Sequence, residues 1–509
     1  MHARSLVLAL ALAGCRPAEP AGTVFYASGA DLQSINALVT THPLAKQVQR
    51  YVLFTTLARY DSSLALAPYL ARGWQWSADR RTLVFALQPL VHWHDGDLTT
   101  SADVKFTLDA ARDPATGYPR ASELSCVTDV GAPAGDSVTI SFCRPQESFP
   151  DVLTDLAVLP VHLLAGVPRV QLRSAAFNEH PVGNGPFRFA RHEPNRRWIF
   201  EANHEFPAAL GGPPAIQRLA IIVVDEATTK LAALVDGELD VAGIAPMHAS
   251  LVRRIGGRGV VTYPLLLTYG LVWNTSRAPF GDPRVRRALT MALDRRQMVD
   301  AYLWGFGEIA DGPVPPAHPL AATVAHVAFD RSAARALLDS LGWRAGPDGV
   351  RVNDGRRLAF TLSTVGSSDN VLEQLIQADL GAVGVEVTIR QLELGAFLAA
   401  SEGASRDYDA LVTGIAGDLA LGYLGALFDS RRLNGPMQYA QYRSAEVDRA
   451  LDRGDLALVQ RIVSADLPIT FLYHARGVQG LNTRVHGVHM DLRGELASLM
   501  AWHLGARAP

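Results

Sequence analysis

The chain has 509 residues, of which 48% are hydrophobic and 19% are charged, and its formal net charge is −3. This composition excludes a disordered protein and is typical of a globular chain long enough for two or three domains, each with its own core. The basic residues are scattered singly or in pairs, so the charge pattern gives no indication of a surface that binds nucleic acid.

The first residues have the pattern of an export signal. A short basic segment precedes the apolar residues 6–13, and the sequence LAGC at residues 12–15 resembles the lipobox at which bacterial prolipoproteins are lipidated and cleaved. An apolar run this short cannot cross ~30 Å of hydrocarbon as a helix, which takes about 20 residues. We therefore expect a signal peptide at residues 1–14, lipid on Cys15 and a tether at residues 15–22. The alternative is an ordinary core helix.

The stretch of residues 71–112 has the most specific pattern in the chain. Residues 82–87 (TLVFAL) are predicted to form a buried strand, and residues 101–112 change to the period of a helix. Acidic side chains near the start of that helix are stabilised by the positive end of the helix dipole. Between strand and helix, Asp95-Gly96 supplies the positive φ that a tight hairpin turn requires.

These residues match a known signature at spaced positions. The matching residues are Trp74, Ser77, Asp79, Thr82, Phe85, Leu87, Val91, His94, Asp95, Gly96, Ala102, Asp103, Val104 and Phe106. On this pattern the chain resembles the family 5 extracellular solute-binding proteins, the oligopeptide, dipeptide and nickel receptors of ABC importers. The resemblance implies an α/β fold of the periplasmic-binding-protein type (type II-like, cluster C), with two lobes and an additional small domain. It also implies a monomeric receptor outside the cytoplasm that delivers its solute to ABC transporter permease subunits and contains no cofactor.

Three further segments resemble the same family and suggest domain boundaries. Residues 181–187 (PVGNGPF) resemble a crossing between domains, residues 269–274 (YGLVWN) the passage into the third domain, and residues 467–473 (LPITFLY) the return. Strands and a helix alternate over residues 219–244, which predicts a partly parallel sheet. The expected division is domain I at residues 23–40, 180–270 and 467–509, domain II at residues 41–179, and domain III at residues 271–466.

Only two cysteines remain after Cys15. Cys126 and Cys143 lie in two strand-like runs, equally far from a turn centred between residues 134 and 135. Directly opposite residues of an antiparallel pair have Cβ atoms ~4.5–5.5 Å apart, which is close to the geometry of a disulfide. In an exported protein we expect these cysteines to be joined, and the alternative is a pair of buried free thiols.

The expected ligand site depends on the resemblance. Residues 407–418 look like the family's cleft strand, and Asp418 matches the acid that receives the α-ammonium group of the ligand in peptide-binding members. A cation enclosed between lobes loses water, so it must be paired with an anion. The other expected ligand-binding residues are Gly417, Tyr269, Ser28, Gly29, Ala30 and Ser367. The alternative for Asp418 is an exposed loop residue or the cap of a helix that begins near Leu419.

The sequence restricts the ligand only to a class. Loop residues 365–370 lack the arginine with which dipeptide receptors hold the ligand carboxylate, which argues against a strict dipeptide.

His92 and His94 would share one face of a strand and could bind a metal with a third ligand, but His94 belongs to the hairpin signature. The sequence contains no HExxH, nucleophile-elbow or P-loop motif, so we predict a binding protein and no enzyme. We expect a peptide or a similar amine-bearing solute; the alternatives are a nickel or other metal chelate, a sugar, or an exported hydrolase.

Replacing Cys15 by Ser is expected to release the protein from membranes, because stable anchoring depends on the acyl chains attached at that position. Fractionation of cells that express the original and the Cys15→Ser protein measures this release. A Cys15→Ser protein that still sediments entirely with membranes would contradict lipidation.

Overall fold

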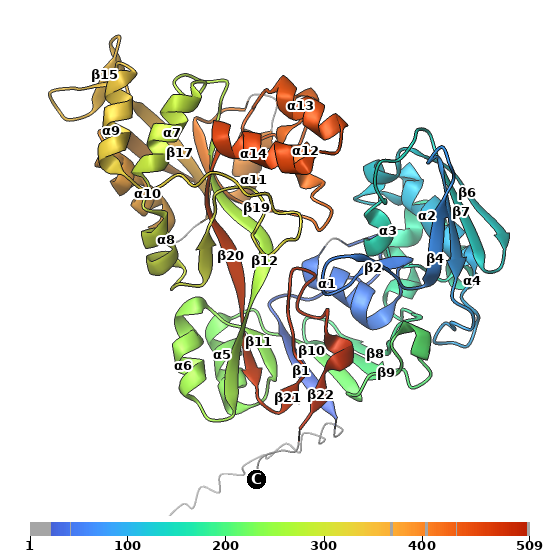
Figure 1. Cartoon of the computed structure of the whole chain (residues 1–509). Helices are drawn as coiled ribbons and strands as arrows, with labels where there is room; N and C mark the ends of the chain where they lie inside the picture. The colour runs from blue at the N-terminus through green and yellow to red at the C-terminus, as the bar shows by residue number, and fades with distance from the viewer. Residues whose placement is uncertain (1–21, 41, 367–369, 403–405, 434, 506–509) are drawn as a thin grey trace, which may run out of the picture.

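The computed structural model describes residues 22–40, 42–366, 370–402, 406–433 and 435–505. The expected signal peptide, the lipidation site Cys15, nearly all of the tether and the loop residue Ser367 lie outside the described residues. Within the described ranges, no helix is both long enough and apolar enough to cross a membrane. Figure 1 shows an upper and a lower lobe joined by two long strands, with a third body beside the lower lobe.

One mixed sheet runs through both lobes. Its strands are β1 (Thr23–Ser28), β8 (Phe187–Glu193), β9 (Arg197–Ala202), β10 (Arg218–Val223), β11 (Val241–Gly243), β12 (Arg258–Trp273), β13 (Gly307–Ile309), β17 (Ala359–Val365), β18 (Glu386–Leu392), β19 (Ala410–Ala416) and β20 (Ile469–Asn482). The order across the sheet is β18-β17-β19-β12-β20-β11-β1-β10-β9-β8, and β13 also pairs with β20. β1 lies between β10 and β11 and is parallel to both, which confirms the partly parallel sheet predicted from residues 219–244.

β12 and β20 connect the two lobes (Figure 1). They are antiparallel, and their pairing changes register between Pro264 and Thr268. The upper part of β20 packs in the cores of the upper lobe, to which Ile469 and Phe471 contribute. The sequence predicted that domain I, which contains the lower lobe, resumes at residue 467. In the structure, the first residues of β20 pack in the upper lobe. A strand that continues through both lobes has no turn residue to mark where it crosses.

Helices cover both faces of the upper part of the sheet. One face carries α7 (Pro283–Ala292), α8 (Arg295–Tyr302), α9 (Arg331–Ser340) and α10 (Val371–Gly381), and the other carries α11 (Leu394–Glu402), α12 (Tyr423–Phe428), α13 (Ala445–Asp452) and α14 (Leu456–Asp466). Successive residues of β12 alternate between the two cores, with Leu271 and Trp273 in the first and Val272 in the second. The two cores therefore lie on opposite faces of one sheet.

The lower lobe and the third body share one hydrophobic core. The lower lobe adds α5 (Ala227–Asp236) and α6 (Ala249–Arg254) to its strands, and the third body contains α1 (Pro43–Val48), a π-helical turn η1 (Gln49–Leu53), β2 (Ala58–Tyr60), β3 (Leu66–Pro68), α3 (Val152–Asp155) and α4 (Val161–Leu164). Other short strands are β14 (Arg344–Ala345), β15 (Arg351–Asn353), β16 (Arg356–Arg357), β21 (Val485–His486) and β22 (His503–Leu504).

The signature stretch forms the centre of the third body. Its sheet has the order β4 (Ala71–Trp76), β5 (Thr82–Leu87), β7 (Ser137–Phe142) and β6 (Val127–Ala134), and α2 (Ser101–Arg112) contacts β6 and β7. β5 and α2 have the predicted bounds, and Gly96 has φ +104° in the turn between them. The acidic start of α2 is confirmed, and the residue that caps it is Thr100, which forms a capping box with Asp103.

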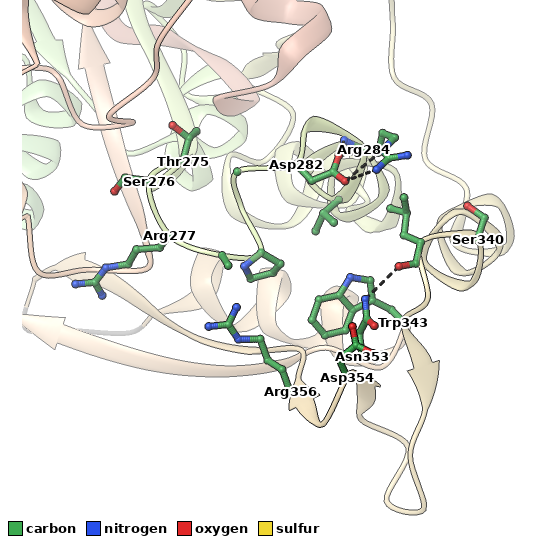
Figure 2. Close-up of a pocket in the computed structure, with 15 residues that line it drawn as sticks. Thr275, Ser276, Arg277, Asp282, Arg284, Ser340, Trp343, Asn353, Asp354 and Arg356 are labelled. Carbon is green, nitrogen blue, oxygen red and sulfur yellow. Dashed lines mark hydrogen bonds and ion pairs between the residues drawn. The ribbon is translucent and has the colours of Figure 1, made fainter.

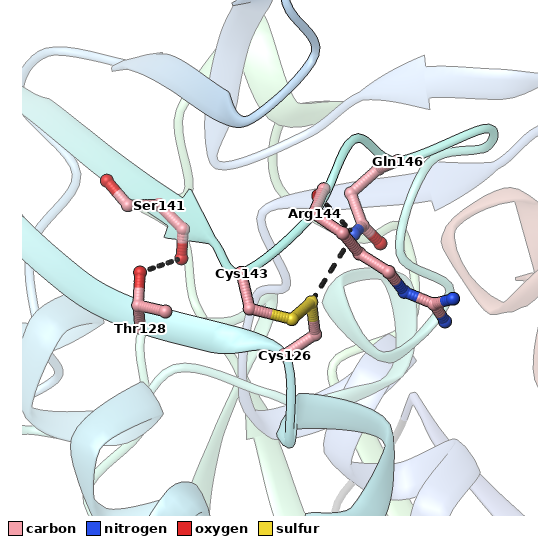
Figure 3. The surroundings of a disulfide bond; sticks show 6 residues. All are labelled: Cys126, Thr128, Ser141, Cys143, Arg144 and Gln146. Atoms are coloured by element: carbon pink, nitrogen blue, oxygen red, sulfur yellow. Dashed lines mark hydrogen bonds between the residues drawn. A yellow bond between two sulfur atoms is a disulfide. The ribbon is translucent and has the colours of Figure 1, made fainter.

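The disulfide joins Cys126 and Cys143 where β6 begins and β7 ends (Figure 3). Their Cα atoms are 5.1 Å apart, and the Cys143 N–H donates to the Cys126 carbonyl at 2.7 Å. The neighbouring pair Val127 and Phe142 is in register, so the two cysteines are opposite each other. The structure therefore has the pairing that was expected from the symmetry of the hairpin.

The crossing segment at residues 181–187 needs its glycines for close packing. The Gly185 N–H donates to the Leu53 carbonyl at 2.9 Å, and the His94 N–H donates to the Gly183 carbonyl at 2.8 Å. A Cβ at Gly183 would overlap the Leu53 carbonyl oxygen, and a Cβ at Gly185 would lie 2.5 Å from the Leu53 carbonyl carbon. Neither glycine has positive φ, so neither is needed to form a sharp turn. Glycine is required at both positions because two backbones approach each other closely.

Gly183→Ala is expected to lower the free energy of unfolding by about 1–3 kcal/mol, because the added methyl group forces one of the two backbones to move. The measurement is urea denaturation followed by tryptophan fluorescence. Gly166→Ala is the matched control, since a Cβ at Gly166 meets nothing within 4 Å. Unfolding of both variants at the same urea concentration as the unmodified protein would show that this contact does not constrain the crossing segment.

Candidate functional site

One cavity lies on the upper lobe alone. It has a volume of about 930 Å³, and Figure 2 shows Thr275, Trp343 and Arg356 among the residues that line it. Its lining residues all fall within residues 275–356, so movement of one lobe toward the other does not enclose a ligand there. None of the expected site residues lines it.

A smaller cavity, of about 200 Å³, lies where the upper lobe meets the third body. We call it the Asp418 cavity. The upper lobe contributes Gly417, Asp418 and Leu419, and the connecting strand β12 contributes Leu266. The other lining residues are Arg50, Tyr60, Arg120, Asp151, Thr154, Asp155 and Leu492. Two of the expected ligand-binding residues, Gly417 and Asp418, thus face residues from a distant part of the chain.

The position of Asp418 is fixed by the end of β19 and the start of α12. The Gly417 N–H donates to the Leu266 carbonyl at 2.8 Å, which holds the turn against β12. The Asp418 carboxylate accepts the N–H groups of Gly422 at 2.8 Å and Tyr423 at 2.9 Å. Asp418 therefore caps the start of α12, as the alternative interpretation expected, and lines the cavity at the same time.

Burial raises the pKa of the Asp418 carboxyl above its ordinary value. The hydrogen bond from the Gly422 N–H opposes this rise, and the nearby Asp151 carboxylate adds to it. A positive group placed in the cavity would favour the ionised form of Asp418. An ionised carboxylate has acceptor sites beyond the two that the backbone N–H groups use.

The facing wall is organised around one buried carboxylate. Asp155 pairs with Lys46 at 2.9 Å, Arg50 at 3.1 Å and Arg120 at 2.8 Å, and its side chain is only 9% exposed. Burial alone would raise the pKa of Asp155, but these three cations hold it well below its ordinary value. Since each of the three cations already pairs with an anion, the wall keeps its shape without a ligand.

The rest of the wall adds a second acid. Arg120 also pairs with Asp151 at 3.3 Å, and the Tyr60 hydroxyl donates to Asp151 at 2.9 Å. The charged side chains that line the cavity are two arginines, Arg50 and Arg120, and three aspartates including Asp418. Lys46 lies behind Asp155, so three cations balance three carboxylates, and Asp418 is the carboxylate without a basic partner among the described residues. A cationic group of a ligand would pair with it.

The structure does not bring Tyr269 to Asp418. The Tyr269 ring stacks on Tyr473 with centroids 5.0 Å apart, in the core that also contains Leu271. Asp418 binds α12, which covers the opposite face of the sheet. The expected loop after β1 lies in the lower lobe: the Ser28 hydroxyl donates to the Ala30 carbonyl at 2.5 Å, and Gly29 and Ala30 are exposed. None of these residues lines the Asp418 cavity.

His92 and His94 contact separate carbonyl groups. His92 Nδ1 lies 3.0 Å from the Gly96 oxygen, and His94 Nε2 lies 3.0 Å from the Gly185 oxygen. Burial lowers the pKa of His94 to about 4, so the ring is neutral at pH 7. Among the described residues, no three His, Cys, Asp or Glu side chains are grouped as metal ligands would be. His94 thus connects the hairpin to the crossing segment.

Sequence reasoning missed the acidic and basic wall of the cavity. Arg50, Arg120, Asp151 and Asp155 belong to separate elements, and no local pattern places them together. One local signal exists: Lys46 and Arg50 are four residues apart in a helical run with no other charged residue, so two like charges share one face and favour an acid between them.

A two-lobed α/β chain whose lobes are joined by long strands, with a charged cavity between the upper lobe and the body beside the lower lobe, has the architecture of a solute-binding protein of the periplasmic type. The chain belongs to the bacterial extracellular solute-binding proteins, family 5: residues 65–431 match the family described as "Bacterial extracellular solute-binding proteins, family 5 Middle". This match confirms the family and the fold class that the signature indicated.

Relatives match over most of the chain. It is 25% identical over 490 residues to the oligopeptide-binding protein AppA of Bacillus subtilis, which covers 92% of this chain and 89% of that protein. It is 30% identical over 459 residues to Protein XP55 of Streptomyces lividans, covering 87% of this chain and 82% of that protein. The solved structure of Bacillus subtilis AppA in complex with a nonapeptide has a TM-score of 0.76 at 23% identity, covering 95% of this chain and 99% of that chain. HbpA2 from Haemophilus parasuis has a TM-score of 0.81 at 20% identity, covering 95% and 100%.

Asp155→Asn is expected to lower the free energy of unfolding by about 3–5 kcal/mol, because three buried cations lose their shared anion. Asp136→Asn is the control, since the Arg72–Asp136 pair at 3.4 Å has both side chains at least half exposed and such a pair contributes about 0–1 kcal/mol. Urea denaturation of both variants measures the difference. Equal losses would show that Asp155 does not organise the wall.

Proposed function

We propose that this protein is a receptor outside the cytoplasm that captures a peptide, or a similar amine-bearing small solute, between its two lobes and delivers it to the permease subunits of an ABC transporter. Membership of the solute-binding family supports the receptor role. The relative AppA is named an oligopeptide-binding protein, and its solved structure contains a nonapeptide, which supports the peptide. The observation that carries the proposal is the Asp418 cavity between the upper lobe and the third body, in which Asp418 has no basic partner among the described residues.

The proposed binding step pairs the ligand ammonium group with Asp418. The backbone N–H groups of Gly422 and Tyr423 hold the carboxylate in place before the ligand arrives, so little side-chain freedom is lost on binding. Asp151, held by Tyr60 and Arg120 on the facing wall, supplies a second acceptor for the ammonium group. A hydrogen bond between charged groups is roughly twice as strong as a neutral one, and excluding water strengthens it further.

Movement of the lobes completes the proposed cycle. With Asp418 on the upper lobe and Asp151 on the third body, a bound ammonium group stabilises the arrangement in which the two sides approach each other. We further propose that the receptor acts as a monomer, is anchored through lipid on Cys15, and releases its ligand chemically unchanged.

Asp418→Asn is expected to weaken the binding of peptides with a free N-terminus by on the order of 2–5 kcal/mol, because the substitution keeps the shape but removes the charge. The experiment incubates purified protein with a pool of synthetic oligopeptides, identifies retained peptides by mass spectrometry and measures their affinity by calorimetry. N-terminally acetylated copies, which lack the ammonium group, should bind the unmodified protein as weakly as free peptides bind Asp418→Asn.

Asp455→Asn is the matched control for the capping role. Asp455 caps α14 by accepting the Leu458 N–H at 2.9 Å but does not line the Asp418 cavity. Its peptide affinity should therefore stay unchanged. An affinity loss below about 0.5 kcal/mol for Asp418→Asn, the size of a neutral surface change, would contradict ammonium binding at this residue. Recovery of cleaved peptides would contradict a receptor that leaves its ligand unchanged.

A further inference from the structure

A second cavity, of about 290 Å³, adjoins the Asp418 cavity. The two share Arg50, Tyr60, Thr154 and Leu419, so one wall separates them. The charged residues that line the second cavity are three arginines, Arg50, Arg59 and Arg493, and one acid, Asp61. We call it the basic chamber, because arginines outnumber acids among its lining residues.

Among the residues that the structure describes, Arg59 has no ionic partner. β2 carries it into the wall of the chamber, where its guanidinium group lies 4.4 Å from the centre of the Tyr69 ring. No carboxylate in the described ranges lies within ion-pair distance of Arg59. A guanidinium that stacks on an aromatic ring keeps its N–H donors available at the edge, where they match the two oxygens of a carboxylate.

Arg50 offers a second unused donor. The π-helical turn η1 carries both Arg50 and Tyr51 to the wall of the chamber, and such widened turns are frequent at functional sites. One terminal nitrogen of Arg50 pairs with Asp155 at 3.1 Å, while its Nε is buried and has no hydrogen-bond partner among the described residues. A buried donor without a partner is costly, and an acceptor on a ligand would satisfy it.

The other two charged residues of the chamber are already engaged. Arg493 pairs with Asp491 at 2.6 Å. The Asp61 carboxylate accepts the N–H groups of Ser63 at 2.8 Å and Ala65 at 3.0 Å within its own turn. Among the charged residues of the chamber, the hydrogen-bonding capacity left is therefore that of Arg59 and Arg50, and it favours an anion.

We propose that the basic chamber binds a carboxylate of the ligand, namely an acidic side chain at the first or second position of a peptide whose ammonium group is held by Asp418. This proposal rests on the proposed function and names the class of peptide. Because the two cavities share a wall, the ammonium group and the carboxylate must be close together along the ligand. Opposite charges in adjoining cavities also fix the direction in which the peptide binds.

The experiment uses synthetic oligopeptides with free N-termini that differ only in Glu or Gln at one of the first four positions. The unmodified protein should bind the Glu peptide about tenfold more tightly at position 1 or 2, and with less than about a twofold difference at positions 3 and 4. Arg59→Gln should reduce that preference to below about threefold and leave the requirement for a free N-terminus unchanged. Arg59 is exposed, so its substitution tests binding with little effect on folding.

Arg72→Gln is the matched control, because Arg72 is an exposed arginine of the same body and pairs with Asp136 outside both cavities. It should keep the full preference for Glu. Equal binding of Glu and Gln peptides to the unmodified protein, or an unchanged preference in Arg59→Gln, would overturn the chamber and leave the proposed function standing. If no peptide with a free N-terminus binds, the proposed function fails, and the chamber proposal fails with it.

Discussion

The antiparallel pairing of β12 with β20 connects the two lobes, and the position of the site depends on it. The ladder between these strands changes register between Pro264 and Thr268, where the chain passes from one lobe to the other. An interrupted ladder bends more easily than a continuous one. In this same segment the Leu266 carbonyl accepts the Gly417 N–H, and Leu266 lines the Asp418 cavity. The junction between the lobes and the wall of the site are thus one piece of chain.

The charges of the site fall into two groups with different roles. On the third body, Asp155 is surrounded by Lys46, Arg50 and Arg120, so this wall is electrically satisfied without a ligand. On the upper lobe, backbone N–H groups hold Asp418, but no basic side chain pairs with it among the described residues. Burial of Asp418 disfavours its charged form, and a ligand cation removes that cost. The proposed preference for an amine rests on the position of this one acid without a basic partner.

The sequence predicted those features that depend on neighbouring residues. The strand and the helix of the signature stretch have the bounds that their hydrophobic periods indicated, and Gly96 adopts the positive φ of the turn. The opposite positions of Cys126 and Cys143 followed from counting residues on either side of a turn. The partly parallel sheet followed from the alternation of strands with a helix over residues 219–244. Each of these features depends on geometry within a short segment, which residue types and spacing determine.

The family also came from the sequence, through a pattern of spaced residues, as did the expectation that Asp418 faces the ligand. Only the tertiary structure decided which face of the sheet Tyr269 occupies, and it placed that ring on the face opposite Asp418. Only the tertiary structure brought Arg50, Arg120 and Asp155 into one wall. Periodicity shows that a side chain is buried, but not what it is buried against, because contacts between residues far apart in the chain arise from the packing of whole elements.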